Sequence, residues 1–269
     1  MSYLLKREVL RSTHQRLEIP SLEDNEAIKN IKTRRAIRDY DTSRDVSDEL
    51  INRIIEAGGY APSAENQQPW RIIVVRDKKL KEFIGQIAVE RTILLFGRAT
   101  PREELERRLS YIESKASLER TIDILISGQR FEYIKGKPET NGAPVLLVLA
   151  VDQTHVGNSQ PTLRGTGGVY GWSGPRHAVI AGSMMMENMA LAAASLGLGS
   201  CVSSVQLDHF DDVGAISEKL NIPFPHWVPI LCLTLGYPKY ERTLGPPRQG
   251  PEEIAFLNKW GEPFVKEEK

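Results

Sequence analysis

The chain is poor in cysteine and has no net charge. Its two cysteines, Cys201 and Cys232, form no CxxC pair, which argues against a disulfide scaffold or a zinc knuckle and favours reduced thiols in a cytoplasm. Basic and acidic side chains both number 35. Balanced charge gives no reason to expect a nucleic acid or a membrane as a partner. We therefore expect a cytoplasmic protein.

Long hydrophobic runs are missing as well. No segment reaches the roughly 18 apolar residues of a membrane-crossing helix, and the start of the chain lacks the apolar stretch of a secretory signal. Residues 1–22 are mildly basic and amphipathic, as a mitochondrial presequence is. Glu8 and the lack of a Ser-rich stretch instead favour an N-terminal arm that docks on a partner subunit.

Several motifs of catalysis and metal binding are absent. The sequence contains no HExxH, GxSxG or Walker motif, and its five histidines lack metal-ligand spacing. The glycines of residues 165–171 do not form the dinucleotide fingerprint, because Tyr170 occupies its last glycine position. We expect no metal site. The choice between NADH and NADPH stays open.

Hydrophobic periodicity predicts one α+β domain over residues 1–269. A helix apolar almost all round, at residues 176–196, is expected to be central. Residues 98–131 form a helical insert, residues 153–173 a long loop and residues 239–269 an extended tail. Further helices are expected at residues 25–32, 47–57, 78–92, 100–128 and 208–220, the last capped by Asp208, and strands at 71–75, 143–151, 200–205 and 228–235.

Two segments stand out for their chemistry. TRRAIR, at residues 33–38, puts three guanidinium groups close together. It reads either as a solvated basic patch or as a site for bidentate capture of phosphate. APSAENQQPW, at residues 61–70, is either a plain rigid turn or a loop whose amides contact a flat heterocycle.

Together these segments resemble the FMN-dependent nitroreductase superfamily. RRAIRDY is followed by a helix, by APSAENQQPW and by the strand RIIVV, and the later stretches NMALAA, LGLG and LGYP are also similar. The similarity covers residues 31–77 and 176–248. It implies an α+β, nitroreductase-like fold with a central, mostly antiparallel sheet flanked by helices. It also implies an intertwined homodimer that binds FMN at its interface.

The resemblance assigns the basic residues to the flavin. Arg34 and Arg35 would hold the ribityl phosphate, and Arg38 would reach the pyrimidine edge of the ring. Ala36 stands where the family usually has serine. Arg248 matches a last basic contact to the phosphate, with Arg242 as an alternative.

Two further groups of residues are implied. Pro62, Ser63, Ala64 and Asn66 would meet the flavin from the partner subunit. Residues Val202, Ser203 and Ser204 match the stretch beside the flavin N5 atom, although relatives often have proline, glutamate and glycine there. Aromatic candidates for stacking on an acceptor are Tyr111, Phe131, Tyr133, Tyr170 and Trp172.

The implied activity is FMN-dependent oxidation of NADH or NADPH, with ping-pong transfer to a nitroaromatic, quinone or related small-molecule acceptor. No protein side chain need act as the catalyst, because the flavin carries the chemistry. Two alternatives remain. The chain could belong to a branch that dehalogenates, fragments the flavin or oxidises heterocycles, or it could bind FMN without turnover.

Overall fold

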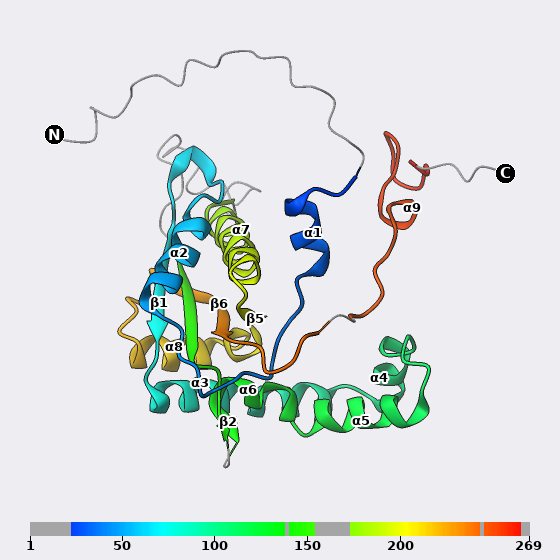
Figure 1. The fold of residues 1–269 in the computed structure, drawn as a ribbon, viewed down its shortest axis with the longest axis horizontal. Coiled ribbons are helices and arrows are strands. Elements are labelled where there is room, and N and C mark those ends of the chain that lie inside the picture. Colours follow the sequence, from blue (N-terminus) through cyan, green and yellow to red (C-terminus); the bar gives the residue numbers. More distant parts are fainter. Residues whose placement is uncertain (1–22, 138–139, 154–172, 243–244, 265–269) are drawn as a thin grey trace.

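The computed structural model describes residues 23–137, 140–153, 173–242 and 245–264. Its middle layer is an antiparallel sheet in the strand order β1-β4-β6-β5 (Figure 1). The expected arm at 1–22 and nearly all of the expected loop at 153–173 lie outside these residues. The strands are β1 (Trp70–Val75), β4 (Val145–Asp152), β5 (Gly199–Ser203) and β6 (Trp227–Gly236), with a separate pair β2 (Gly136–Lys137) and β3 (Thr140–Asn141).

Strand β4 is the centre of the fold. All eight of its residues are buried. Val145, Leu147 and Leu149 belong to one hydrophobic cluster, whereas Leu146 and Val148 belong to a second cluster. Because successive side chains of a strand point to opposite faces, this alternation means that both faces of the sheet are covered. The prediction of a buried central strand is confirmed.

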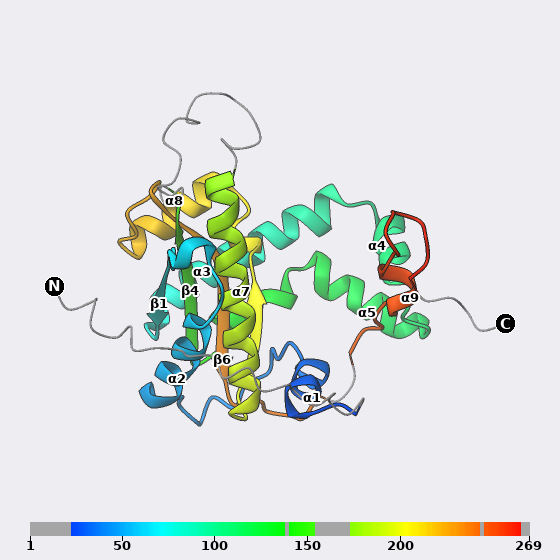
Figure 2. The same ribbon diagram turned by 90° about the horizontal axis from the view of Figure 1, so that it is seen from above.

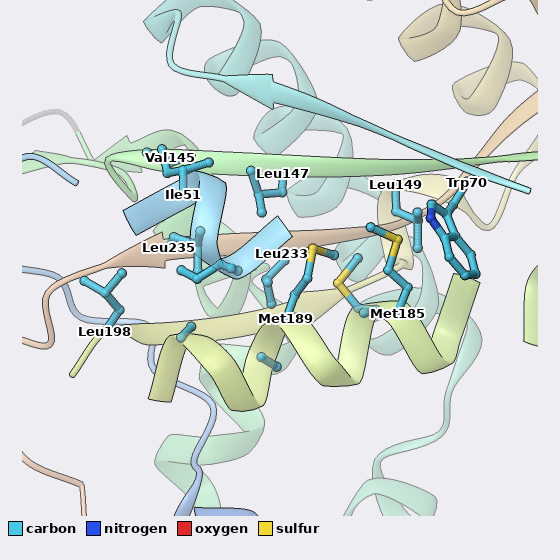
Figure 3. Packing of buried hydrophobic residues seen from close by; sticks show 14 of the residues in the cluster. Ile51, Trp70, Val145, Leu147, Leu149, Met185, Met189, Leu198, Leu233 and Leu235 are labelled. Atoms are coloured by element: carbon cyan, nitrogen blue, oxygen red, sulfur yellow. The ribbon is translucent and has the colours of Figure 1, made fainter. Parts of the chain in front are cut away.

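Helices cover each face of the sheet. α7 (Ser173–Ser195) packs on β4, β5 and β6, and α2 (Asp48–Gly59) packs on α7. Figure 3 shows Met185 and Met189 of α7 pointing toward the strands. The second cluster lies under α3 (Lys78–Thr92), α6 (Glu132–Lys135) and α8 (Phe210–Lys219). The layers therefore match the expected α+β arrangement.

Close packing of α2 on α7 requires a glycine. A Cβ atom on Gly58 would lie 2.5 Å from Cγ of Met189, whereas one on Gly59 would meet nothing within 4 Å. We expect Gly58→Leu to lower the free energy of unfolding by about 1–3 kcal/mol through overpacking. Gly59→Leu, in the same helical turn, is expected to be neutral or stabilising. Urea denaturation measures both, and equal losses would contradict the contact.

The helical insert differs from its prediction. Residues 100–128 were expected to be one helix, but the structure has α4 (Arg102–Arg108) and α5 (Lys115–Ile126). The break is explained by Ser114, whose hydroxyl accepts a hydrogen bond from Ser117 N (3.4 Å) and begins α5. Upstream, α3 continues into a π-helical turn, η2 (Ile93–Ala99). Figures 1 and 2 both show α4 and α5 projecting from the body.

One other expectation, the cap of α8, needs correction. α8 is capped by His209, whose ring Nδ1 accepts from Asp211 N (3.4 Å), and not by Asp208. α7 packs on the sheet and on α2, as the expected central position requires, while Val179, Ile180 and Met184 are about 40% exposed. The stretch Arg176–Ser195 of α7 is long and apolar enough to cross a membrane. Core helices of soluble proteins meet the same criterion of length and composition.

The ends of the described chain lie beside this body. α1 (Glu26–Thr33) contacts α7 through Asn30, whose Nδ2 donates to Leu191 O (3.0 Å). Residues 239–242 and 245–264 contain one short helix, α9 (Pro251–Ile254), and an isolated bridge between Phe256 and Pro263.

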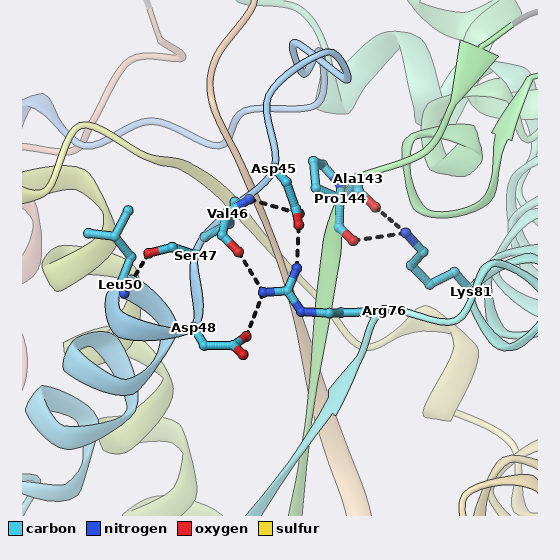
Figure 4. Close-up of polar contacts among 9 residues, drawn as sticks. All are labelled: Asp45, Val46, Ser47, Asp48, Leu50, Arg76, Lys81, Ala143 and Pro144. Atoms are coloured by element: carbon cyan, nitrogen blue, oxygen red, sulfur yellow. Dashed lines mark hydrogen bonds and ion pairs between the residues drawn. The ribbon is translucent and has the colours of Figure 1, made fainter.

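Arg76 fixes the connection between the N-terminal segment and α2. Its guanidinium donates to the carboxylates of Asp45 (2.9 Å) and Asp48 (2.8 Å) and to Val46 O (Figure 4). Beside it, the amine of Lys81 donates to the carbonyls of Ala143 (2.8 Å) and Pro144 (2.9 Å). The Arg76 contacts hold residues 45–48 against the end of β1, and the Lys81 contacts join α3 to the residues that lead into β4.

Candidate functional site

The arginine-rich segment leaves α1 and pairs with the sheet. Arg34 ends α1 in an extended conformation. Ala36 then forms a parallel bridge with Ser200 of β5, and Ile37 N donates to Ser200 O (2.8 Å). A Cβ atom on Gly199 would lie 2.8 Å from the Ile37 side chain. Glycine at 199 therefore permits the close approach of the two segments.

Tyr40 anchors the other end of this segment. Its buried hydroxyl donates to Ile37 O (2.7 Å) and lies 2.7 Å from Thr234 Oγ1 on β6. Burial raises the pKa of Tyr40 well above its usual value, so the phenol stays neutral and keeps this bond. Asp41 N also donates to Tyr237 O (2.9 Å). The segment that carries the arginines thus has a fixed path along the sheet.

Three guanidinium groups on this path have unsatisfied donors. The Nε atoms of Arg34, Arg35 and Arg38 are buried and have no aligned hydrogen-bond partner among the described residues. Arg34 Nε lies 3.3 Å from a carboxylate oxygen of Glu187, but the geometry is that of an ion pair only. Buried N–H groups without an acceptor are costly. An anionic or carbonyl-bearing ligand would supply the missing acceptors, so these residues fit the phosphate and pyrimidine edge of FMN.

The structure brings Val202, Ser203 and Ser204 to the same edge of the sheet. Val202 is 38% exposed, whereas Ser203 is buried and its hydroxyl accepts from Gln206 Nε2 (3.2 Å). Ser204 follows β5 and is half-buried. Of these three residues, Val202 has the most exposed side chain, whereas the Ser203 side chain is buried and bonded to Gln206.

The loop at residues 62–66 is not brought to the arginines within one chain. It lies across α7 from α1 in both views (Figures 1 and 2). Pro62, Ala64 and Asn66 are exposed and Ser63 is half-buried, with its hydroxyl accepting from Gln68 N (3.0 Å). Left-handed backbone conformations at Glu65, Asn66 and Gln68 are of the kind that concentrates at functional sites.

The C-terminal tail passes beside the arginine segment. Arg242 Nη1 donates to Ala36 O (3.2 Å). A Cβ atom on Gly245 would lie 2.9 Å from Nε of Arg35. Arg248, three residues further on, is exposed. The tail therefore brings Arg242, the alternative candidate for the phosphate contact, against the arginine-rich segment.

Two more residues surround Arg38. The Arg38 guanidinium carbon lies 5.7 Å from the centre of the Tyr133 ring, and Arg130 is close enough for repulsion from Arg38 to lower its pKa, after the larger effect of burial. Tyr133 was among the aromatic candidates, but Arg130 was missed because no local motif marks it. Tyr170 and Trp172 lie outside the described residues. Within the described ranges, no cluster of metal-ligating side chains occurs.

Comparison with known proteins decides the family. The family model described as the nitroreductase family matches residues 31–237. The chain belongs to the nitroreductase family. A putative NAD(P)H nitroreductase of Staphylococcus epidermidis is 23% identical over 234 residues, which cover 82% of this chain and 91% of the relative.

Other nitroreductases match in part or by fold. A putative NADH dehydrogenase/NAD(P)H nitroreductase of Archaeoglobus fulgidus is 53% identical over 55 residues, or 20% of this chain and 31% of that protein. The matches to the first curated relatives thus span about a third of their length. A nitroreductase structure with bound FMN from Desulfitobacterium hafniense covers 88% of this chain and all of its own, with a TM-score of 0.56 and 22% identity. The fold class expected from the sequence is confirmed.

Proposed function

We propose that this nitroreductase-family protein is an FMN-dependent oxidoreductase. It takes hydride from NADH or NADPH and passes it to a nitroaromatic, a quinone or a related small molecule, and the two substrates bind in turn. The observation that carries the proposal is the set of buried guanidinium Nε atoms at Arg34, Arg35 and Arg38 that have no hydrogen-bond partner among the described residues. The names of the relatives from S. epidermidis and D. hafniense support the electron donor and the flavin. A cytoplasmic location is part of the proposal.

The residues of this chain would bind and orient the cofactor, which supplies the hydride transfer when it is bound. Arg34 and Arg35 would hold its phosphate, because the guanidinium fork matches phosphate oxygens, and Arg248 would close over it. Arg38 would place a positive charge at the pyrimidine edge, which favours acceptance of electrons there. Backbone N–H groups of residues 202–204 would orient the ring.

The proposal includes a homodimer, in which the loop at 62–66 of one copy completes the site of the other. Support comes from apolar side chains that the single chain leaves exposed on α1 and α7, which contact each other. They are Ile28, Ile31, Val179, Ile180 and Met184. Exposed apolar side chains on two neighbouring helices are of the kind that protein interfaces cover.

The test is cofactor uptake followed by turnover. The purified protein is offered excess FMN, freed of unbound flavin and examined by absorbance. It is then assayed for NADH and NADPH oxidation with a quinone and with a nitroaromatic acceptor. We expect a yellow protein that oxidises at least one donor only when an acceptor is present. Flavin-stripped protein serves as the matched control, and activity should return when FMN is restored.

Two other results would change the assignment. Protein that takes up no FMN would overturn the proposal. FMN uptake without oxidation of either donor would favour the alternatives, which are another branch of the superfamily or a non-catalytic FMN-binding protein.

A further inference from the structure

A cavity of about 640 Å³ opens beside Arg38, and neither Arg34 nor Arg35 lines it. Three parts of the chain form its wall: residues 38–43, the stretch from α5 to β3, and Lys239 and Arg242 at the start of the tail. Residues 202–204 do not line it either. Of the residues assigned to the flavin, the cavity is lined by Arg38 and by Arg242, the alternative phosphate contact.

Positive charge dominates the lining of the cavity. The acidic residues are Asp39, Asp41 and Glu132, and Glu132 already lies 3.7 Å from the amine of Lys137. The basic residues are twice as many, namely Arg38, Arg120, Arg130, Lys137, Lys239 and Arg242. A concave surface with one prevailing sign of charge concentrates ligands of the opposite sign.

The arginines of the wall lack carboxylate partners. Within the described part of the chain, no carboxylate lies within ion-pair distance of Arg38, Arg120 or Arg130. Arg38 and Arg130 are half-buried, and burial together with repulsion from Arg38 lowers the pKa of Arg130. Arginine nonetheless stays charged at any ordinary pH. Two adjacent, partly desolvated positive charges are therefore left uncompensated.

Tyr133 also lines this wall, with its ring centre 5.7 Å from the guanidinium carbon of Arg38. It is 92% buried, and its hydroxyl has no aligned hydrogen-bond partner among the described residues, although Cys201 and Ser203 lie close. Burial raises the pKa of this phenol, so Tyr133 adds no negative charge to the wall. The unsatisfied charge in this wall is therefore that of the guanidinium groups, and an anion is the ligand that compensates it.

We infer that this cavity binds a small molecule bearing phosphate or carboxylate groups, held by Arg38 and Arg130 with Arg120 at the rim. The planar guanidinium fork pairs with both kinds of group in a bidentate way. The inference adds to the proposed function a second anion site next to the flavin site. It does not require the protein to be an oxidoreductase.

The experiment uses pyrophosphate and citrate as probes, titrated calorimetrically into the full-length protein before and after FMN loading. We expect at least one probe to bind in both states. Arg130→Gln and Arg120→Gln should each raise its dissociation constant about tenfold or more, because each removes a charge-assisted contact. Arg98→Gln is the matched control, since Arg98 is an exposed arginine of the same insert outside the cavity lining.

The outcomes separate this inference from the proposed function. The tighter probe identifies the preferred anionic group. The inference is overturned if neither probe binds in the millimolar range, if Arg120 and Arg130 variants bind as the control does, or if FMN loading abolishes probe binding. The last result would make the cavity part of the flavin site. Probe binding without FMN uptake would instead support the anion site in the cavity and refute the proposed FMN-dependent activity.

Discussion

Replacing Arg34 and Arg248 together with alanine is expected to weaken FMN binding by about two to four orders of magnitude. Each side chain is proposed to make a charge-assisted contact to the phosphate, worth about 1.5–3 kcal/mol. Two such contacts sum to about 3–6 kcal/mol, and about 1.4 kcal/mol corresponds to a tenfold change in affinity. Quenching of flavin fluorescence on titration measures the dissociation constant in both proteins.

The control for this double variant removes the same charge elsewhere. Arg53→Ala combined with Arg98→Ala takes away two exposed arginines that lie outside the proposed site. Its FMN affinity should stay within about twofold of the unchanged protein, because exposed charges are screened by solvent and salt. Arg34→Lys keeps the positive charge but loses the planar guanidinium fork. Its FMN affinity is expected to lie between those of the Arg34 and Arg248 double variant and the control. Unchanged affinity in the Arg34 and Arg248 double variant, with its circular dichroism intact, would refute the phosphate assignment.

Met189→Ala is expected to lower the free energy of unfolding by about 2–5 kcal/mol, the range for truncating a fully buried methionine. Met189 has no exposed surface and packs between Gly58 of α2 and the sheet (Figure 3). Because close-packed neighbours relax only in part, the substitution leaves a cavity as well as removing apolar contact. Denaturant titration monitored by fluorescence of the four tryptophans measures the loss.

Met184 supplies a matched comparison on the same helix. It is 42% exposed in the single chain, so Met184→Ala should cost less than about 1 kcal/mol in a monomer. In the proposed homodimer the same side chain would be covered. The loss of stability in Met184→Ala would then depend on protein concentration, because subunit association stabilises the folded state by mass action. A large, concentration-independent loss for Met184→Ala would contradict the observed burial.

The sequence predicted the elements whose signal is local. The helix at residues 78–92 has the expected bounds, and the apolar run near Val145 is the buried strand β4. The insert was read as one helix because its apolar spacing continues through residues 109–112, while the break depends on the Ser114 cap. The apolar composition of α7 predicted its central position, but composition alone does not show that Val179, Ile180 and Met184 stay exposed in the single chain.

Prediction of the site had a different limit. The arginine segment was recognised from its side chains, but its position beside β5 depends on a bridge from Ala36 to Ser200, far away in the sequence. Arg130 and Tyr133 reach Arg38 through the path of the insert, which no motif encodes. The site assignments themselves stay predictions until FMN binding is measured.

The pairing of Ala36 with β5 has a consequence for how the protein behaves in solution. β5 is the last strand on its side of the sheet, and an uncovered border strand can recruit strands of other molecules and promote aggregation. Residues 36–37 occupy part of that border. The same short stretch carries the arginines. Substitutions that break its pairing with β5 are therefore expected to reduce solubility and ligand uptake together.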